Sequence, residues 1–161
     1  MKKIALLFLL LITTFSLRAE IRLYKGWSTS SSNCIATYKD GRFFKGWSTS
    51  SSDCAATCEK NRIYKGWSTS SSNCIATYKD GRLYKGWSTS SSDCMATYRE
   101  GRIYKGWSTS SSNCIATYKD GRLYKGWSTS SSDCIMTLQT RFQSDFIMVA
   151  WFITNFYRLI K

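Results

Sequence analysis

The chain has 161 residues and a formal net charge of +13, from 23 lysines and arginines against 10 aspartates and glutamates. It contains no histidine, which excludes Ser-His-Asp and Cys-His catalysis, and its carboxylates recur along the chain without forming a unique pair. We therefore expect a protein that is not an enzyme and needs no cofactor. The excess of positive charge predicts an anionic partner, the alternative being that it only keeps the surface soluble.

A basic segment and a short apolar run open the chain. Lys2 and Lys3 precede nine apolar residues from position 4 to position 12, and Ala19 supplies a small residue for cleavage. Nine apolar residues are too few to span a bilayer, so residues 1–19 are predicted to be a secretory signal peptide; an uncleaved membrane anchor is the alternative. We expect the protein in the periplasm, the outer envelope or the medium, which argues against nucleic acid as a partner.

Residues 20–139 contain one motif six times at a constant spacing of 20 residues. It reads Leu-Tyr-Lys-Gly-Trp-Ser-Thr-Ser-Ser-Ser with small changes, then Asn or Asp, then Cys. A fixed period of this length marks a repeat architecture in which one unit cannot bury its own apolar face. The residue before the cysteine alternates, which suggests a duplication of 40 residues: Asn33, Asp53, Asn73, Asp93, Asn113 and Asp133.

Each repeat is joined to the next by a turn such as Asp40-Gly41. Asp-Gly between two β-prone runs favours a type I′ turn, so Cys34–Tyr38 is expected to pair with Phe43–Trp47 as a hairpin. The first repeat begins with an unpaired strand, Leu23–Trp27, and the last ends with another, Cys134–Leu138. Pairing these two strands removes both sheet edges and predicts an all-β fold, a closed barrel of twelve antiparallel strands.

The register across each turn also predicts which face points inward. Ala36 is expected opposite Lys45, and six lysines at one level cannot share a dry interior, because each buried charge would cost several kcal/mol. The face with the lysines and tryptophans is therefore predicted to point outward. The face with Ile35, Thr37 and Phe44 is predicted to point inward.

A lysine and a tryptophan two residues apart recur on this predicted outward face. Tryptophan favours the headgroup depth of a membrane and lysine meets anionic lipid, so the pair suits a membrane interface. The alternative is that lysine stems simply cover the indoles. The candidate binding residues are Lys25, Trp27, Lys45, Trp47, Lys65, Trp67, Lys85, Trp87, Lys105, Trp107, Lys125 and Trp127.

Residues 140–161 are predicted to form a hydrophobic C-terminal helix. Ser144 is a plausible N-cap, Asp145 suits the first turn, and the apolar run Phe146–Ile153 follows. A helix that is apolar all round is buried or lies in a membrane. A twelve-stranded barrel leaves a bore of roughly 12–14 Å, about the width of one helix, so we expect this helix to plug the barrel. A membrane anchor or a partner-binding helix is the alternative.

Seven cysteines and six serine-rich runs complete the repeats. Equivalent cysteines should lie two strands apart, about 9.5 Å, whereas bridged Cα atoms rarely exceed about 7 Å, so we expect mostly free thiols. Without a Cys-x-x-Cys pair, no metal site is expected. The Ser-Thr-Ser-Ser-Ser runs are interpreted as loops whose hydroxyls satisfy backbone groups; a hydroxyl-rich surface for glycan or ice is the alternative.

The segment Ile63-Tyr64-Lys65-Gly66-Trp67-Ser68-Thr69-Ser70-Ser71-Ser72 through Gly81 resembles the repeats of bacterial β-flower proteins, which are radially symmetric, shallow barrels of hairpins. The resemblance extends over Ile21–Leu138. A β-flower is similar in shape to the C-terminal domain of Tubby-like proteins and scramblases, a twelve-stranded barrel around a hydrophobic helix. That similarity implies a connection with membranes or lipids, although no Tubby-type phosphoinositide-binding residue can be mapped here.

The leading hypothesis is an exported β-flower barrel that binds an anionic or amphiphilic surface of the envelope. Anionic lipid, lipopolysaccharide or an acidic glycan would be its partner. A carbohydrate or cell-wall binding module is the second hypothesis, because Gly-Trp every 20 residues also resembles choline- and glucan-binding repeats, which stack as an open solenoid. The third is a structural envelope protein without a ligand.

Overall fold

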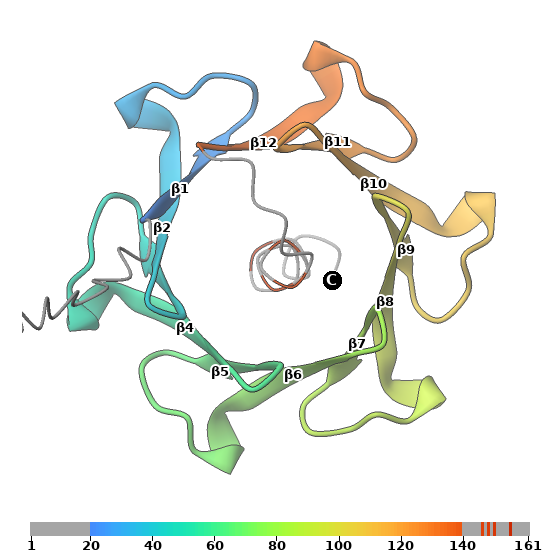
Figure 1. Ribbon diagram of the computed structural model, residues 1–161, viewed down its shortest axis with the longest axis horizontal. Helices are drawn as coiled ribbons and strands as arrows, with labels where there is room; N and C mark the ends of the chain where they lie inside the picture. Colours follow the sequence, from blue (N-terminus) through green and yellow to red (C-terminus); the bar gives the residue numbers. More distant parts are fainter. Residues whose placement is uncertain (1–19, 140–145, 147, 149, 151–154, 156–161) are drawn as a thin grey trace, which may run out of the picture.

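The computed structural model describes residues 20–139 together with Phe146, Met148, Ala150 and Asn155. Twelve strands form one closed antiparallel barrel, seen down its axis in Figure 1. The predicted signal peptide, residues 1–19, lies outside the described residues. The strands are β1 (Ile21–Lys25), β2 (Cys34–Lys39), β3 (Arg42–Lys45), β4 (Cys54–Glu59), β5 (Arg62–Lys65), β6 (Cys74–Lys79), β7 (Arg82–Lys85), β8 (Cys94–Arg99), β9 (Arg102–Lys105), β10 (Cys114–Lys119), β11 (Arg122–Lys125) and β12 (Cys134–Leu138).

The first and last strands close the barrel, as predicted. β1 pairs antiparallel with β12, with Leu23 opposite Leu138 and Tyr24 opposite Thr137. Every strand therefore has two hydrogen-bonded neighbours, and no strand edge is left open to pair with another chain. The closed ring contradicts the open solenoid expected for choline- and glucan-binding repeats.

The tight turns have the predicted geometry. Asp40 and Gly41 both have positive φ, 48° and 76°, as a type I′ turn requires, and Lys60 and Asn61 adopt the same conformation without glycine. These turns also lie close to the next hairpin, because the amide of Tyr98 donates to the carbonyl oxygen of Gly81 at 2.7 Å. Each turn thus serves both its own hairpin and the contact between hairpins.

A β-bulge recurs in each repeat. Leu23 lies opposite Ala36, but the next residue, Tyr24, lies opposite Cys34, which leaves Ile35 as an extra residue on β2. The same register shift recurs between β3 and β4 and at the four later equivalents. A bulge bends its strand and strengthens the local twist. Each bulge lies at the beginning of its strand, directly after the loop between hairpins.

The six loops between hairpins project outward and are called petals here (Figure 1). They are residues 26–33, 46–53, 66–73, 86–93, 106–113 and 126–133. Each petal ends in one turn of 3-10 helix: η1 (Ser31–Asn33), η2 (Ser51–Asp53), η3 (Ser71–Asn73), η4 (Ser91–Asp93), η5 (Ser111–Asn113) and η6 (Ser131–Asp133).

The apolar core lies inside the ring. Leu23, Ala36 and Phe43 belong to it with their equivalents in the other repeats, and so do Met148 and Ala150, both fully buried. Figure 1 places this C-terminal segment at the centre of the barrel. The remaining residues of the predicted helix lie outside the described part of the chain, so the helical plug as a whole stays a prediction.

The predicted register is confirmed, but the predicted inward position of Thr37 and Phe44 is wrong. Ile35, the extra residue of the bulge, does pack against the core as predicted. Ala36 does pair with Lys45 and Thr37 with Phe44. Ala36, however, points into the core, whereas Thr37 and Phe44 are buried on the outer side of the sheet, where Phe44 contacts the ring of Trp67 at 6.3 Å. The argument from buried charge failed because the lysines end their strands, where the barrel opens, and so an inward position there is exposed.

Two glycines in equivalent turns provide a test of the contact between hairpins. Gly81 and Gly121 have nearly the same φ, 72° and 75°, but a Cβ at Gly81 would lie 2.9 Å from the carbonyl oxygen of Tyr98. A Cβ at Gly121 would lie 3.7 Å from the nearest backbone oxygen. Both alanine variants should lose about 1–2 kcal/mol through the left-handed conformation. Gly81→Ala should lose about 1 kcal/mol more through the clash, as measured by chemical denaturation.

Equal losses of stability in Gly81→Ala and Gly121→Ala would contradict the close approach of the hairpins. Asn61→Gly serves as a control, because it should leave stability the same or raise it by relieving the positive φ of a residue with a side chain.

Candidate functional site

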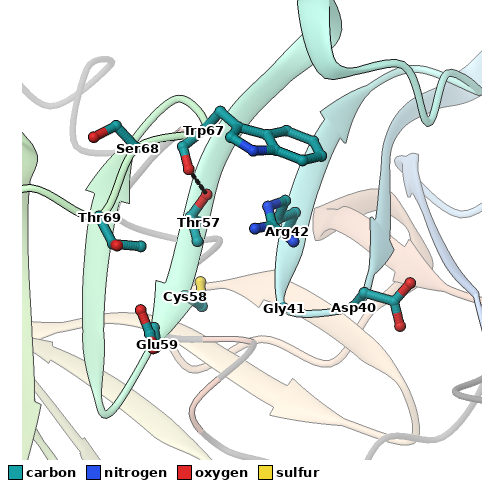
Figure 2. Close-up of a pocket in the computed structure, with 9 residues that line it drawn as sticks. All are labelled: Asp40, Gly41, Arg42, Thr57, Cys58, Glu59, Trp67, Ser68 and Thr69. Carbon is teal, nitrogen blue, oxygen red and sulfur yellow. Dashed lines mark hydrogen bonds between the residues drawn. The ribbon is translucent and has the colours of Figure 1, made fainter.

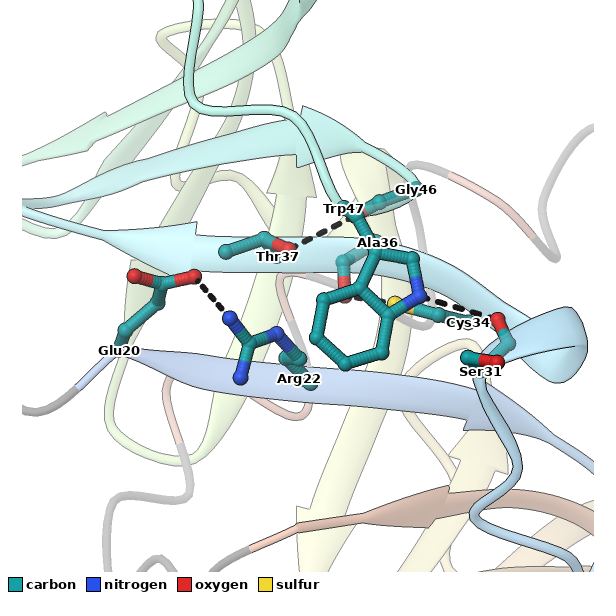
Figure 3. Close-up of polar contacts among 8 residues, drawn as sticks. All are labelled: Glu20, Arg22, Ser31, Cys34, Ala36, Thr37, Gly46 and Trp47. Carbon is teal, nitrogen blue, oxygen red and sulfur yellow. Dashed lines mark hydrogen bonds and ion pairs between the residues drawn. The ribbon is translucent and has the colours of Figure 1, made fainter.

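Each petal covers the outer face of the preceding hairpin with its tryptophan. The ring of Trp47 stacks on the guanidinium of Arg22 in β1, which lies 3.9 Å from the ring centroid (Figure 3). The same ring meets Tyr24 edge-on, with 6.5 Å between the two centroids. The same stack recurs at all six positions, with distances of 3.8–4.2 Å. The last contact, Trp27 on Arg122 at 4.0 Å, closes the circle. Neighbouring hairpins are thus joined by side chains as well as by the backbone.

The arginines in these stacks were not predicted as functional residues. They are Arg22, Arg42, Arg62, Arg82, Arg102 and Arg122, and the Nε atom of each is buried without a hydrogen-bond partner among the described residues. Arg22 also forms an ion pair with Glu20 at 2.8 Å. In the part of the chain that the structure describes, no carboxylate pairs with the other five. The arginine at a constant position of each repeat was a usable signal, but its partner lies in another repeat. In five pairs the tryptophan is 25 residues further on, and Arg122 stacks with Trp27 of the first repeat.

The petals are of two kinds, according to whether they end in aspartate or asparagine. In the petal of Asp53, the hydroxyl of Ser48 donates to the carboxylate at 2.5 Å, and the amide of Ser48 donates to the carbonyl of Lys45 at 3.2 Å. The indole N–H of Trp47 donates to the carbonyl of Ser31, in the preceding petal, at 3.0 Å (Figure 3). The petals of Asp93 and Asp133 have the same three bonds.

The asparagine petals are anchored differently. The hydroxyl of Thr57 donates both to the carbonyl of Gly66 at 2.8 Å and to that of Trp67 at 3.3 Å. Within the described residues, the indole N–H groups of Trp27, Trp67 and Trp107 make no hydrogen bond. The six-fold repeat therefore has three-fold symmetry in detail, in agreement with the alternation in the sequence.

Two clefts open on the flank of the barrel, both beside an asparagine petal. The larger, about 710 Å³, lies between Arg42 and Asp40 on one hairpin and Trp67, Ser68 and Thr69 on the next petal (Figure 2). The second cleft is about 360 Å³ and is lined by the equivalent residues, Asp80, Arg82, Trp107, Ser108 and Thr109. The two clefts thus share the same set of groups: hydroxyls, a guanidinium, a carboxylate and an indole.

The lysines form a separate surface, which we call the lysine ring: Lys25, Lys45, Lys65, Lys85, Lys105 and Lys125. All six are exposed and end their strands where the petals begin. Alternation along the strand places Lys45 on the same side as the core residue Phe43, toward the barrel axis. Lysines and tryptophans therefore do not share one face: the lysines surround one mouth of the barrel, and the tryptophans cover its flank.

Apolar residues of the bulges lie at the same mouth. They are Ile35, Ala55, Ile75, Met95, Ile115 and Ile135. Three of the isoleucines and Met95 are half-buried and pack against the core, whereas Ala55 and Ile75 are exposed. The carboxylates described at this end are Asp53, Asp93 and Asp133, and each accepts a hydrogen bond from a serine hydroxyl. The mouth therefore combines cationic and apolar side chains.

All seven cysteines are free thiols, where the sequence predicted mostly free thiols. Six of them share one environment, in which the thiol of Cys34 or its equivalent donates to the carbonyl two residues on, at 3.5–3.6 Å. Burial raises the pKa of Cys34, as it does at Cys74, and it raises the pKa of Cys58 to about 12 with a smaller contribution from Cys54. A protonated thiol is a poor nucleophile.

In residues 20–139 and the four described positions beyond, no group of three or more cysteines or carboxylates is placed to hold a metal ion. No helix in the same part of the chain has the length and apolar character to cross a bilayer.

The family model for 6-fold beta flower proteins matches residues 23–150. The chain belongs to this family. The match covers all six hairpins and reaches the buried Met148 and Ala150. No curated protein and no solved structure matches the chain. The expected similarity to Tubby-like domains therefore has no support from the comparisons, and the membership in the β-flower family rests on the repeat itself.

The reactivity of Cys58 follows from its raised pKa. In the folded protein at pH 8, iodoacetamide should leave Cys58 unmodified, because a pKa of about 12 keeps its thiol protonated. After unfolding without a reductant, all seven cysteines should be alkylated, because none is bridged. Mass spectrometry of peptides measures both. Alkylation of Cys58 in the folded protein at the rate of an unfolded thiol, or a disulfide recovered from the unfolded protein, would show that this environment is wrong.

Proposed function

We propose that this β-flower protein is an exported, non-enzymatic protein that binds an anionic membrane surface with the mouth that carries the lysine ring. The observation that carries the proposal is the arrangement of six exposed lysines around one opening, next to the apolar residues of the bulges. Export is part of the proposal because residues 1–19 have the pattern of a signal peptide.

A ring of charges at one level suits a flat anionic surface. All six ammonium groups can approach headgroups at once, and each lysine near an anionic membrane contributes about 1 kcal/mol. The rigid barrel holds the lysines in place, so one contact raises the effective concentration of the next. The carboxylates at the same end already accept serine hydroxyls and number half as many as the lysines.

The apolar side chains of the bulges, two of them exposed and four half-buried, give the same mouth an amphiphilic character. Ile75 is 36% exposed, and its equivalents lie at the same level of the ring. The burial of Met148 and Ala150 supports the further proposal that the C-terminal segment fills the barrel, so that this mouth is a closed surface instead of a pore. The tryptophans serve here as clamps between hairpins, because each stacks on an arginine of its neighbour.

Vesicle binding tests the lysine ring. Replacement of Lys45, Lys85 and Lys125 by glutamine should weaken binding to vesicles of phosphatidylglycerol and phosphatidylcholine on the order of a hundredfold and flatten its salt dependence. Cosedimentation at two salt concentrations measures both effects.

The matched control replaces Lys39, Lys79 and Lys119, which end β2, β6 and β10 at the opposite mouth, by glutamine. This variant loses the same net charge, so it should bind nearly as well as the parent protein if the lysine ring is the docking surface. Equal losses of vesicle affinity in the two variants would show that binding depends on net charge alone and not on the lysine ring. Failure of the parent protein to bind anionic vesicles would end the proposal.

A further inference from the structure

The asparagine petals leave hydrogen-bond donors unused beside the clefts. Trp47 gives its indole N–H to the carbonyl of Ser31, and Trp87 and Trp127 do the same at their positions. Among the described residues, Trp67 and Trp107 have no such acceptor, yet both line a cleft. The cleft residues thus belong to the petals in which the indole donor is still available for a ligand.

The guanidinium in each cleft adds further donors. Arg42 is held by its stack on Trp67 at 4.1 Å, and Arg82 by its stack on Trp107 at 3.9 Å (Figure 2). Within the described part of the chain neither pairs with a carboxylate, and the Nε atoms of both are buried without a partner. A guanidinium fixed on an aromatic ring is pre-organised, so less conformational entropy is lost when its remaining N–H groups bind a ligand.

The polar groups shared by the two clefts indicate an uncharged ligand. Each cleft has one arginine and one aspartate from the same turn, Arg42 with Asp40 and Arg82 with Asp80. Glu59 adds a second carboxylate to the larger cleft and Arg99 a second guanidinium to the smaller, so the two clefts share no net charge of one sign. Both clefts also carry a serine and two threonines, whose hydroxyls donate and accept. A ligand rich in hydroxyl groups matches this mixture of donors and acceptors better than an inorganic anion does.

The indole supplies the apolar part of the site. Trp67 is 48% exposed even though Arg42 covers one face of its ring, so a large part of the indole is accessible to a ligand. An aromatic surface beside convergent polar groups binds a molecule with an apolar face and hydroxyl edges, which is the chemistry of a pyranose ring. The cleft volumes, about 710 and 360 Å³, are in the range of small-molecule sites.

We infer that the two clefts beside the asparagine petals of Trp67 and Trp107 bind neutral oligosaccharides of pyranose sugars, and that the equivalent stack of Trp27 on Arg122 forms a third such site. The sites are centred on Arg42 with Trp67, on Arg82 with Trp107, and on Arg122 with Trp27, which repeats the same stack. The aspartate petals do not bind, because their indole N–H groups are already bonded within the protein. The sites lie on the flank of the barrel and do not use the lysine ring, so this inference is independent of membrane binding.

The parent protein can be tested first, by NMR and calorimetry. The probes are cellotetraose, chitotetraose and maltotetraose. We expect saturable binding of at least one of them at three sites per chain. The indole N–H resonances of Trp27, Trp67 and Trp107 should move on titration, and those of Trp47, Trp87 and Trp127 should not. Binding of none of the three probes, a different number of sites, or equal movement of both sets of resonances would overturn the inference.

Two matched triple variants distinguish the indole N–H groups that are free to bind a ligand from those that are hydrogen-bonded within the protein. Replacement of Trp27, Trp67 and Trp107 by phenylalanine keeps an aromatic ring on each arginine but removes the free donor, so affinity for the sugar should fall about tenfold, while the melting temperature falls less than in the second variant. Replacement of Trp47, Trp87 and Trp127 by phenylalanine removes three internal hydrogen bonds, so the melting temperature should fall while sugar affinity is kept. The reverse pattern would assign the free indoles a purely structural role.

Competition with inorganic phosphate tests the class of ligand. Phosphate at ten times the sugar concentration should not displace the sugar, because the aspartate of each cleft disfavours an anion. Displacement by phosphate would make the clefts anion sites and overturn the proposal for neutral sugars. Arg42→Met adds a check on a single cleft, since it should lower the number of bound sugars from three to two.

Discussion

Pairing between β1 and β12 is the contact on which the rest of the barrel depends. Each hairpin alone is a two-stranded ribbon, which is marginally stable in water. Joining hairpins in a row would still leave an open edge at each end, and the register of Leu23 with Leu138 removes both. Once the ring is closed, the residues of one face converge on the axis, and alanine and large aliphatic side chains fill the interior around Met148 and Ala150.

Closure of the barrel also determines which hairpin each petal contacts. Each petal leaves the barrel at a bulged strand end and folds back over the preceding hairpin, where tryptophan stacks on arginine. Because the ring is closed, every hairpin both gives and receives one such clamp. The aspartate petals add an indole hydrogen bond to the clamp, whereas the asparagine petals make none to any described residue. The alternation of aspartate and asparagine thus coincides with a three-fold pattern of hydrogen bonds around a six-fold barrel.

This division separates the two surfaces proposed to bind ligands. The lysine ring presents repeated charge at one mouth, where six weak contacts can act together on a flat anionic membrane. The clefts on the flank share one arginine, one aspartate and an indole, and they have no net charge of one sign in common. A barrel docked by its mouth would keep its flank free, so an envelope lipid and a neutral sugar can occupy the same protein together.

The sequence by itself determined the elements that depend on local chemistry. Asp40-Gly41 and its equivalents specify type I′ turns, the period of 20 sets six hairpins, and the unpaired Leu23–Trp27 and Cys134–Leu138 segments indicate closure into twelve strands. Free thiols also followed, from the spacing of neighbouring strands. Only the tertiary structure decided which face points inward, because both faces of each strand carry large apolar or aromatic residues, such as Phe43 and Phe44. The outer one is covered by a tryptophan from another repeat, and no local pattern contains that contact. The pairing of Arg42 with Trp67, and hence the clefts, likewise depended on how a petal folds over its neighbour.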